Sequence, residues 1–415
     1  MIAVLRNPTY AKLFGAQVVA LLGTGLLTVA LGLLAFDIAG GDAGVVLGIA
    51  MTIKMVAYVG VAPVVSALTH RLPRGPLLVG ADLVRAGVAV SLPFVAEAWQ
   101  IYLLIFLLQS ASATFTPAFQ AVIPSVLPGE AAYTRALSLS RLAYDLESLV
   151  SPMLAAALLT VVTYHDLFAG TVAGFLASAA LVLASRTPRV EAPPHTGFLD
   201  RLTRGVRAFR AGSELRGLLA LDLVVATATA MVIVNTVVLV RGELGGTQSD
   251  VALLLGAYGA GSMAVALVVP ALVDRTPDRR VMLTGATLLP ILLLAAVPLM
   301  VGPGDAAQWV ALLAVWFLLG AATSAILTPS ARLLRRNSGE PNRQAVFAAR
   351  FSLSHACFLV TYPLAGSLGA LVGLPGVALV LAAIGAAGTV SAFRAWTRVR
   401  RLAAPALSVR RRRVR

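Results

Sequence analysis

Hydrophobic segments long enough to cross a lipid bilayer recur from one end of this chain to the other. Each holds roughly 20 apolar residues, enough for a helix rising 1.5 Å per residue to cross about 30 Å of hydrocarbon. Because the bilayer interior offers the backbone no hydrogen-bond partners, such segments cross it as helices. We predict an all-α membrane protein with twelve transmembrane helices, near residues 13–36, 45–68, 77–96, 100–123, 137–163, 167–185, 217–240, 251–273, 281–301, 307–331, 348–372 and 375–393.

Lysine and arginine occupy every second gap between these segments. Thirty of the 33 basic residues fall in these gaps or at the span ends that border them, Arg241 lies on the opposite side, and Lys54 and Arg85 lie deeper inside predicted spans. Since basic loops stay in the cytoplasm, the pattern places both termini there. Twelve is the even number of helices that keeps the alternation intact.

The composition agrees with a membrane location. Apolar residues make up 59% of the chain and charged residues 12%, against roughly 45–50% and 25% for soluble domains. The net charge of +15 predicts cytoplasmic loops that face anionic lipid headgroups. No aromatic-interleaved basic patch accompanies it, so we expect no nucleic-acid partner. Two lysines against 31 arginines indicate a GC-rich genome, and therefore a bacterial inner membrane.

Several kinds of chemistry lack their motifs. Neither lysine follows a glycine, so there is no Walker A sequence, and no G-x-S-x-G elbow precedes a suitable helix. The single Cys357 excludes an internal disulfide. Four scattered histidines give no metal-ligand spacing. We therefore expect no enzyme, no cofactor and no metal site.

The chain divides into two halves at its least hydrophobic stretch. We predict a six-helix bundle over residues 1–185, a cytoplasmic linker over 186–216, a second bundle over 217–393 and a basic cytoplasmic tail over 394–415. In the linker, arginines alternate with apolar residues at helical spacing, which predicts either an amphipathic helix on the inner membrane surface or a solvated connection. The apolar positions are Phe198, Leu199, Leu202, Val206 and Phe209.

The two halves repeat each other's landmarks. His70-Arg71 precedes Asp274-Arg275 by 204 residues, and Thr116-Pro117 precedes Thr328-Pro329 by 212. Pro152 precedes Pro363 by 211. Parallel duplicated halves characterise a large class of secondary transporters, in which the substrate site lies near the membrane midplane.

These motifs resemble the major facilitator superfamily, and within it the twelve-helix drug and siderophore exporters of bacteria. The start of the chain, Leu5-Arg6-Asn7-Pro8 with Leu13-Phe14-Gly15, is similar to that branch. The loop signature G-x-L-x-D-R-x-x-x-R is matched by Leu272, Asp274, Arg275, Arg279 and Arg280, and in the first half by Leu68, Arg71 and Arg74, with His70 at the aspartate position. Residues 151–156 stand where the family has the antiporter signature G-P-x-x-G-G, without its glycines.

Ionisable residues inside spans are candidates for proton coupling, because each costs about 2.5–3.5 kcal/mol to insert. Lys54 lies at a depth similar to that of Asp145 and Glu147. These three residues form either a coupled titrating set or a static ion pair. His355 is either a proton relay or a histidine that is simply hydrogen-bonded.

Polar and aromatic residues in four spans are candidates for the substrate cavity. In proteins that this chain resembles, spans 1, 4, 7 and 10 line the central cavity. Aromatic rings and amides suit bulky amphiphilic ligands, although lipid-facing or core packing is the alternative for each ring. The candidates are Gln17, Phe106, Gln109, Phe115, Phe119, Asn235 and Trp316.

A third group of residues suits the cytoplasmic gate that the resemblance implies. Asp82 and Arg85 can pair at (i, i+3), and Arg141 and Arg350 open spans 5 and 11. By resemblance Asp274 braces the gate through Arg275, Arg279 or a helix N-terminus. The full set of gating candidates is His70, Arg71, Arg74, Asp82, Arg85, Arg141, Asp274, Arg275, Arg279, Arg280 and Arg350.

Together these features predict a monomeric secondary transporter that works by alternating access and exports an amphiphilic small molecule against counter-transported protons. An importer of a small metabolite and a non-transporting membrane sensor are the alternatives. An importer of an anion predicts basic residues in spans 1, 4, 7 and 10, and a sensor predicts an added soluble domain. The sequence shows neither.

The predicted topology can be tested with reporter fusions. Fusions at residue 195 and at the C-terminus should report the cytoplasm, and a fusion at Asp305 should report the outside, because basic gaps alternate with neutral ones. An external signal from residue 195 would contradict the count of twelve helices.

Overall fold

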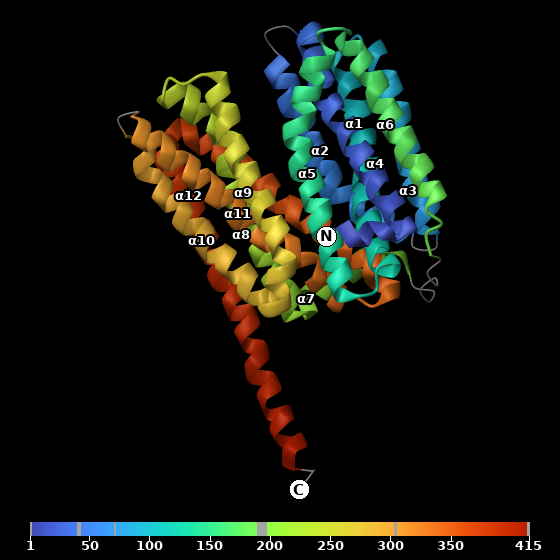
Figure 1. The fold of residues 1–415 in the computed structure, drawn as a ribbon, viewed down its shortest axis with the longest axis vertical. Coiled ribbons are helices and arrows are strands. Elements are labelled where there is room, and N and C mark those ends of the chain that lie inside the picture. The colour runs from blue at the N-terminus through green and yellow to red at the C-terminus, as the bar shows by residue number, and fades with distance from the viewer. Residues whose placement is uncertain (1, 40–42, 70–71, 189–196, 303–304, 413–415) are drawn as a thin grey trace. The chain divides into compact units, whose positions relative to one another are not determined.

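A computed structural model describes residues 2–39, 43–69, 72–188, 197–302 and 305–412, and within these ranges the regular structure is helical (Figure 1). The first half contains η1 (Ile2–Arg6), α1 (Pro8–Ala39), α2 (Ala43–Leu68), α3 (Arg74–Ser91), η3 (Leu92–Phe94), α4 (Ala98–Val126), α5 (Glu130–Leu158) and α6 (Tyr164–Ala184). The rest contains α7 (Phe198–Ala211), α8 (Ser213–Val237), the π-helical η4 (Val238–Glu243), α9 (Gln248–Arg275), α10 (Asp278–Leu299), α11 (Ala306–Arg336), η5 (Glu340–Asn342) and α12 (Arg343–Arg412).

Eleven segments of the described chain are long and apolar enough to cross a membrane. Helix α12 supplies two of them, because it bends at Gly373, whose φ of +69° is a conformation that glycine adopts readily. The predicted span 137–163 corresponds to α5, which has 29 residues but is not among the eleven. Its charged residues Arg135, Arg141, Asp145 and Glu147 lower its hydropathy.

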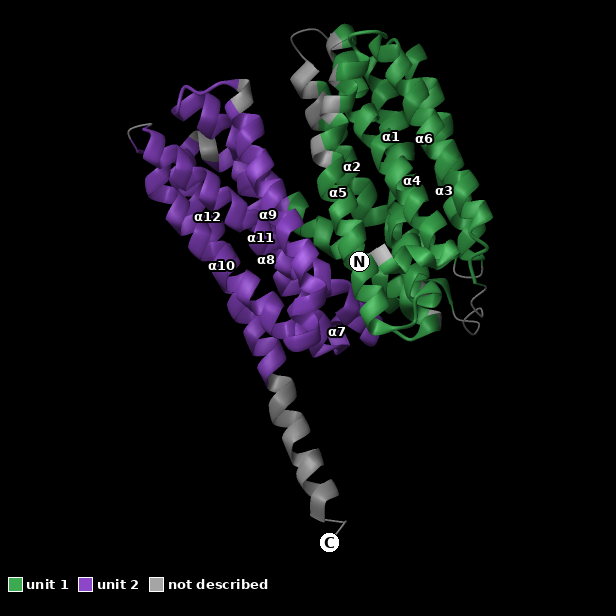
Figure 2. Cartoon of the chain, viewed as in Figure 1, with its two compact units in different colours: residues 1–205, 338–359 green, residues 206–337, 360–415 purple. Residues whose placement is uncertain are grey.

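The structure groups into two compact units, coloured separately in Figure 2. The first comprises residues 1–205 and 338–359, and the second comprises residues 206–337 and 360–415. The first unit therefore includes the beginning of α12, which comes from the second half of the sequence. There the Ser352 hydroxyl donates to the carbonyl of Val59 in α2, and Arg204 of α7 donates to the side chain of Asn342 at 3.1 Å.

Small residues allow helices within each unit to approach closely, as is common in membrane bundles. In the first unit, Thr171 of α6 donates to the carbonyl of Gly23 in α1 at 3.0 Å. In the second unit, Gly261 of α9 and Gly320 of α11 face each other's helix so closely that an added Cβ would overlap the opposite backbone. These crossings fix α1 against α6 and α9 against α11.

Helix starts follow two chemical patterns. Helices α4, α6 and α9 begin with reciprocal capping boxes, such as Thr163 with Asp166 and Thr247 with Asp250. Helices α3 and α10 instead follow Pro73 and Pro277, which have nearly the same backbone angles. These prolines are 204 residues apart, so the repeat found in the sequence is also present in the structure.

The apolar residues of the linker lie on α7, which spans Phe198–Ala211. Phe209 is buried, whereas Leu199 is exposed. An added Cβ on Gly205 would lie 2.6 Å from Cβ of Ala349, so one face of α7 packs on the beginning of α12. This packing holds residues 198–205 of α7 within the first unit.

Candidate functional site

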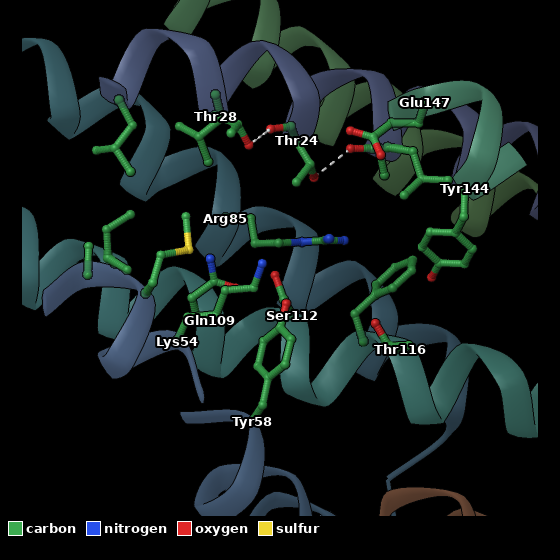
Figure 3. A pocket seen from close by; sticks show the side chains of 18 of the residues that line it. Thr24, Thr28, Lys54, Tyr58, Arg85, Gln109, Ser112, Thr116, Tyr144 and Glu147 are labelled. Carbon is green, nitrogen blue, oxygen red and sulfur yellow. Dashed lines mark hydrogen bonds between the residues drawn. The ribbon is translucent and has the colours of Figure 1, made fainter. Parts of the chain in front are cut away.

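The first unit contains a partly open cavity of about 270 Å³ among α1 to α5 (Figure 3). Apolar side chains from α1 and α4 form much of its wall, and hydroxyl and amide groups interrupt them. The residues that line it are Gln17, Ala20, Leu21, Thr24, Leu27, Thr28, Leu31, Ala50, Met51, Lys54, Tyr58, Arg85, Ile105, Gln109, Ser112, Phe115, Thr116, Tyr144 and Glu147. Three of these carry charges: Lys54, Arg85 and Glu147.

Lys54 of α2 and Glu147 of α5 line this cavity with opposite charges. They reach it from different helices, as Figure 3 shows. The sequence predicted a similar depth for the two residues. Asp145, the other predicted partner of Lys54, forms an ion pair with Arg141 at 2.8 Å, one turn away on the same helix. It is buried and is not among the residues that line the cavity.

Arg85 has its charge balanced in place. Its guanidinium pairs with Asp82, and Ser178 of α6 donates to the other carboxylate oxygen at 2.7 Å. The rings of Phe115 and Phe175 lie 4.3 and 4.6 Å from its central carbon, close enough for cation–π attraction. The predicted (i, i+3) pair therefore forms, and it joins α3 to α4 and α6.

Tyr58 connects the cavity to the beginning of α12. Its ring lies 5.7 Å from the Lys54 ammonium and 4.7 Å from the ring of His355, edge to face. His355 also contacts Phe351, whose carbonyl lies 2.7 Å from Nδ1. His355 therefore lies one aromatic ring away from Lys54, within the first unit.

Gly25 allows α1 and α5 to meet beside the cavity. A Cβ added there would lie 2.8 Å from Oε1 of Glu147. It would also overlap both the hydroxyl oxygen and the Cβ of Ser151. Since a Cβ cannot rotate away, any larger residue at position 25 has to move the backbone of one helix. Gly25 thus sets the position of Glu147.

The other cavity candidates have different surroundings. Gln17 lines the cavity and accepts a hydrogen bond from Ser140 at 2.9 Å. Gln109 and Phe115 also line it. Phe119 is buried and stacks on Phe115 at 5.6 Å, whereas Phe106 is 39% exposed and lies outside the lining.

Two further candidates lie in the second unit, where packing occupies them. Trp316 is fully buried, and its indole donates to Thr236 at 2.9 Å. Asn235 is buried, and its amide lies 3.4 Å from the carbonyl of Ala365. Both side chains join helices of the second unit to one another.

The loop signatures of the two halves are built differently. Arg74 is buried and donates to the carbonyl of Ala121 at 2.9 Å, which ties α3 to the end of α4. His70 and Arg71 lie outside the described residues. In the second half Asp274 is exposed, and the neighbouring Asp278 is buried instead.

Asp278 is a buried carboxylate with two arginine contacts, which differ from the partners Arg275 and Arg279 that the resemblance implied for Asp274. Its carboxylate lies 2.9 Å from a guanidinium nitrogen of Arg336 and 3.5 Å from Nε of Arg332. Arg279 pairs with Glu214 at the start of α8. Arg275 and Arg280 are exposed, and Arg350 is half-buried.

Sequence reasoning overlooked Asp278, Tyr58 and Tyr144. Asp278 was detectable, because an aspartate in the first turn of a helix after a proline suits the helix dipole. The tyrosines gave no such signal, since a lone aromatic residue in an apolar span is common. Their role as cavity wall depends on how α2 and α5 are rotated.

The many long apolar helices define a multi-pass membrane protein. The family model described as Major Facilitator Superfamily matches residues 218–413. Among solved structures, the human organic anion transporter MFSD10 (TETRAN) covers 93% of this chain and 99% of its own, with a TM-score of 0.78 at 12% identity. A bacterial homologue of the iron transporter ferroportin gives 0.77 at 14% identity, covering 94% and 99%. At such identities the likeness shows the fold alone.

Two curated relatives are efflux proteins. Macrolide efflux protein A of Enterococcus faecalis is 28% identical over 191 residues, covering 43% of this chain and 58% of that protein. Its namesake from Streptococcus pyogenes is 27% identical over 187 residues, covering 43% and 45%. The chain thus spans about half the length of the curated relatives it matches. The family model covers a little under half of the chain, and over that part the chain is similar to the major facilitator superfamily, while its curated relatives are drug exporters.

Gly25→Ala tests the close approach of α1 and α5. The new methyl group should force the helices apart, so the purified protein should unfold several degrees lower in a thermal melt. Gly32→Ala on the same helix is the matched control, because a Cβ there meets no atom within 4 Å and alanine favours the helix. Equal melting temperatures for the two variants would contradict the packing described here.

Proposed function

We propose that this protein is a secondary active transporter of a bacterial cytoplasmic membrane, which exports an amphiphilic small molecule in exchange for protons. The efflux relatives support the direction of transport, and the fold supports alternating access. The substrates to test first are macrolides, followed by siderophores and other amphiphilic natural products. Both termini lie in the cytoplasm, and the protein acts as a monomer.

The observation that carries this proposal is the pair Lys54 and Glu147 in the cavity of the first unit. Opposite charges inside a membrane protein attract strongly, because the surrounding dielectric constant is low. Here the two charges lie on different helices, beside a space large enough for part of a ligand. This arrangement favours a role in coupling proton movement to transport over a purely structural role. By contrast, Asp82 and Arg85 are enclosed by rings and a hydroxyl group, which suits a structural role.

The contacts between α2 and the beginning of α12 give this cavity a route to conformational change. Tyr58 contacts both Lys54 and His355, and Ser352 is hydrogen-bonded to α2 one residue further along. We infer that proton and substrate occupancy of the cavity alters how residues 343–359 pack on α2.

Transport into inverted membrane vesicles tests the proposed function. Inverted vesicles that contain the protein should accumulate a macrolide or siderophore when a proton gradient is imposed. Collapse of the gradient should abolish this accumulation. Uptake in right-side-out vesicles alone would favour an importer. Absence of transport across the whole panel would favour a non-transporting sensor.

Lys54→Ala should abolish gradient-driven transport while leaving the protein folded in the membrane, because Glu147 loses its counter-charge across the cavity. Lys12→Ala is the matched control, since Lys12, the chain's other lysine, is exposed and donates to the carbonyl of Ala184. Reversal of both charges, Lys54→Glu with Glu147→Lys, should restore part of the activity. Unchanged transport in Lys54→Ala would show that the lysine is structural or merely tolerated.

A further inference from the structure

The start of α8 is a meeting point for four helices of the second unit. Glu214 lies in the first turn of α8, and its carboxylate pairs with Arg279 of α10. The same carboxylate accepts a hydrogen bond from the amide of Asn337, at the end of α11. The backbone carbonyl of Glu214 accepts another from the indole of Trp396 in α12, at 3.1 Å. One residue thus receives contacts from three other helices.

Trp396 is held in this position from several sides. It is 3% exposed, and the Arg279 guanidinium lies 5.7 Å from its ring, within the distance for cation–π attraction. Gly217 of α8 makes room for the indole, since a Cβ added there would lie 2.0 Å from Nε1 of Trp396. A tryptophan packed this closely fixes the end of its helix against the start of α8.

Exposed arginines surround this tryptophan at the same end of the second unit. The start of α8 contacts α10 and α12 through Glu214, and α9 ends three residues before α10 begins. These helix ends are also the ends of segments able to span a membrane, so they lie at the depth of lipid headgroups. Each of the four carries one exposed arginine: Arg216, Arg275, Arg280 and Arg394.

The chain continues beyond Trp396 with charges of one sign. Residues 398–415, the C-terminal segment, contain eight arginines and no acidic residue. At the nearby helix ends, the carboxylates of Glu214 and Asp278 are already engaged in ion pairs with other arginines. A large positive charge therefore lies next to a membrane surface. Anionic lipid headgroups attract basic segments in this position.

We propose that an anionic phospholipid surface binds the C-terminal segment together with the exposed arginines at this end of the second unit, and that Trp396 transmits this binding to the starts of α8 and α10. The inference goes beyond the proposed transport function, because neither step needs a substrate or a proton. The partner is defined by its phosphate and its net negative charge, as in phosphatidylglycerol.

Several weak attachments to one surface explain how the binding reaches the helices. Basic groups that are held together bind more tightly than separate ones, because each attachment raises the local concentration of the next. With Trp396 packed on Gly217, Arg394 and the C-terminal segment begin beside the arginines of α8 and α10. Release of Trp396 would separate these groups. The lipid surface therefore binds the packed state better, and a ligand that prefers one state increases its population.

The experiment compares the full-length protein in two kinds of nanodisc, one of phosphatidylcholine and one of equal parts phosphatidylcholine and phosphatidylglycerol. A bimane label on Ser408→Cys, in a Cys357→Ser background, reports contact of the C-terminal segment with lipid that carries a nitroxide headgroup. We expect at least twofold stronger quenching with phosphatidylglycerol. The difference should disappear when NaCl rises from about 0.1 M to about 1 M, because the Debye length falls from about 10 Å to about 3 Å.

Hydrogen exchange of the unlabelled protein measures the transmission. Phosphatidylglycerol should slow amide exchange at least twofold in the first two turns of α8 and α10. Exchange in α6 of the first unit should not change, because Trp396 makes its contacts within the second unit. Inorganic phosphate added to phosphatidylcholine nanodiscs should leave all these rates unchanged, since separate phosphates do not form a surface.

Replacement variants separate binding from transmission. Glutamine in place of all eight arginines of the C-terminal segment should remove both the extra quenching and the slowed exchange. Lysine in the same eight positions is the matched control, because it keeps the charge, and both effects should remain. Trp396→Ala should keep the quenching and lose the slowed exchange. Trp396→Phe keeps an aromatic ring against Gly217 but lacks the N–H, so it should retain part of the slowed exchange.

Equal quenching of the glutamine variant and the parent protein with phosphatidylglycerol would overturn the assignment of the lipid surface. Slowed exchange that persists in full in both Trp396 variants would overturn transmission through the tryptophan. Slowed exchange with inorganic phosphate alone would show that a soluble anion, and not a membrane surface, is the partner.

Discussion

The attraction between charges that are held away from water determines how the first unit is organised. Asp82 and Arg85 satisfy each other, and the rings of Phe115 and Phe175 together with Ser178 enclose them. Removal of either partner would leave an uncompensated charge among membrane helices, at a cost of about 3–5 kcal/mol. This pair fixes α3 against α4 and α6. On that side of the cavity the charge of Arg85 already has its partner, whereas Lys54 and Glu147 are the charged groups to which we assign the response to a ligand.

The two halves of the chain share a plan but differ in charge. At the offset of 204 residues that relates Pro73 to Pro277, Lys54 corresponds to Tyr258, Asp82 to Ala286 and Arg85 to Leu289. The equivalents in the second unit thus carry no formal charge. The second unit instead has its buried ion pairs at the start of α10, where Asp278 lies near Arg332 and Arg336. The duplication has produced one half with a polar cavity and one half with a charged helix end.

Much of the architecture could be predicted from the sequence, because a bilayer imposes length and polarity on each segment. Depth along a helix also placed Lys54 and Glu147 at one level, and both line the cavity. Which side of each helix faces the cavity could not be predicted from depth along the helix. Asp145 turned toward Arg141, and Phe106 turned away from the cavity that Phe115 lines. The contact of Tyr58 with His355 depends on tertiary packing between residues almost 300 positions apart, which spacing along the chain does not encode.

Proton movement driven by substrate is the most direct measure of the central claim, that a charge pair in the first unit couples ligand to proton. Inverted vesicles are first acidified inside, and the quenching of an acridine dye reports the gradient. Addition of an exported substrate should restore the fluorescence with the parent protein and not with Glu147→Gln. Export that proceeds at full rate without any recovery of fluorescence would contradict the account.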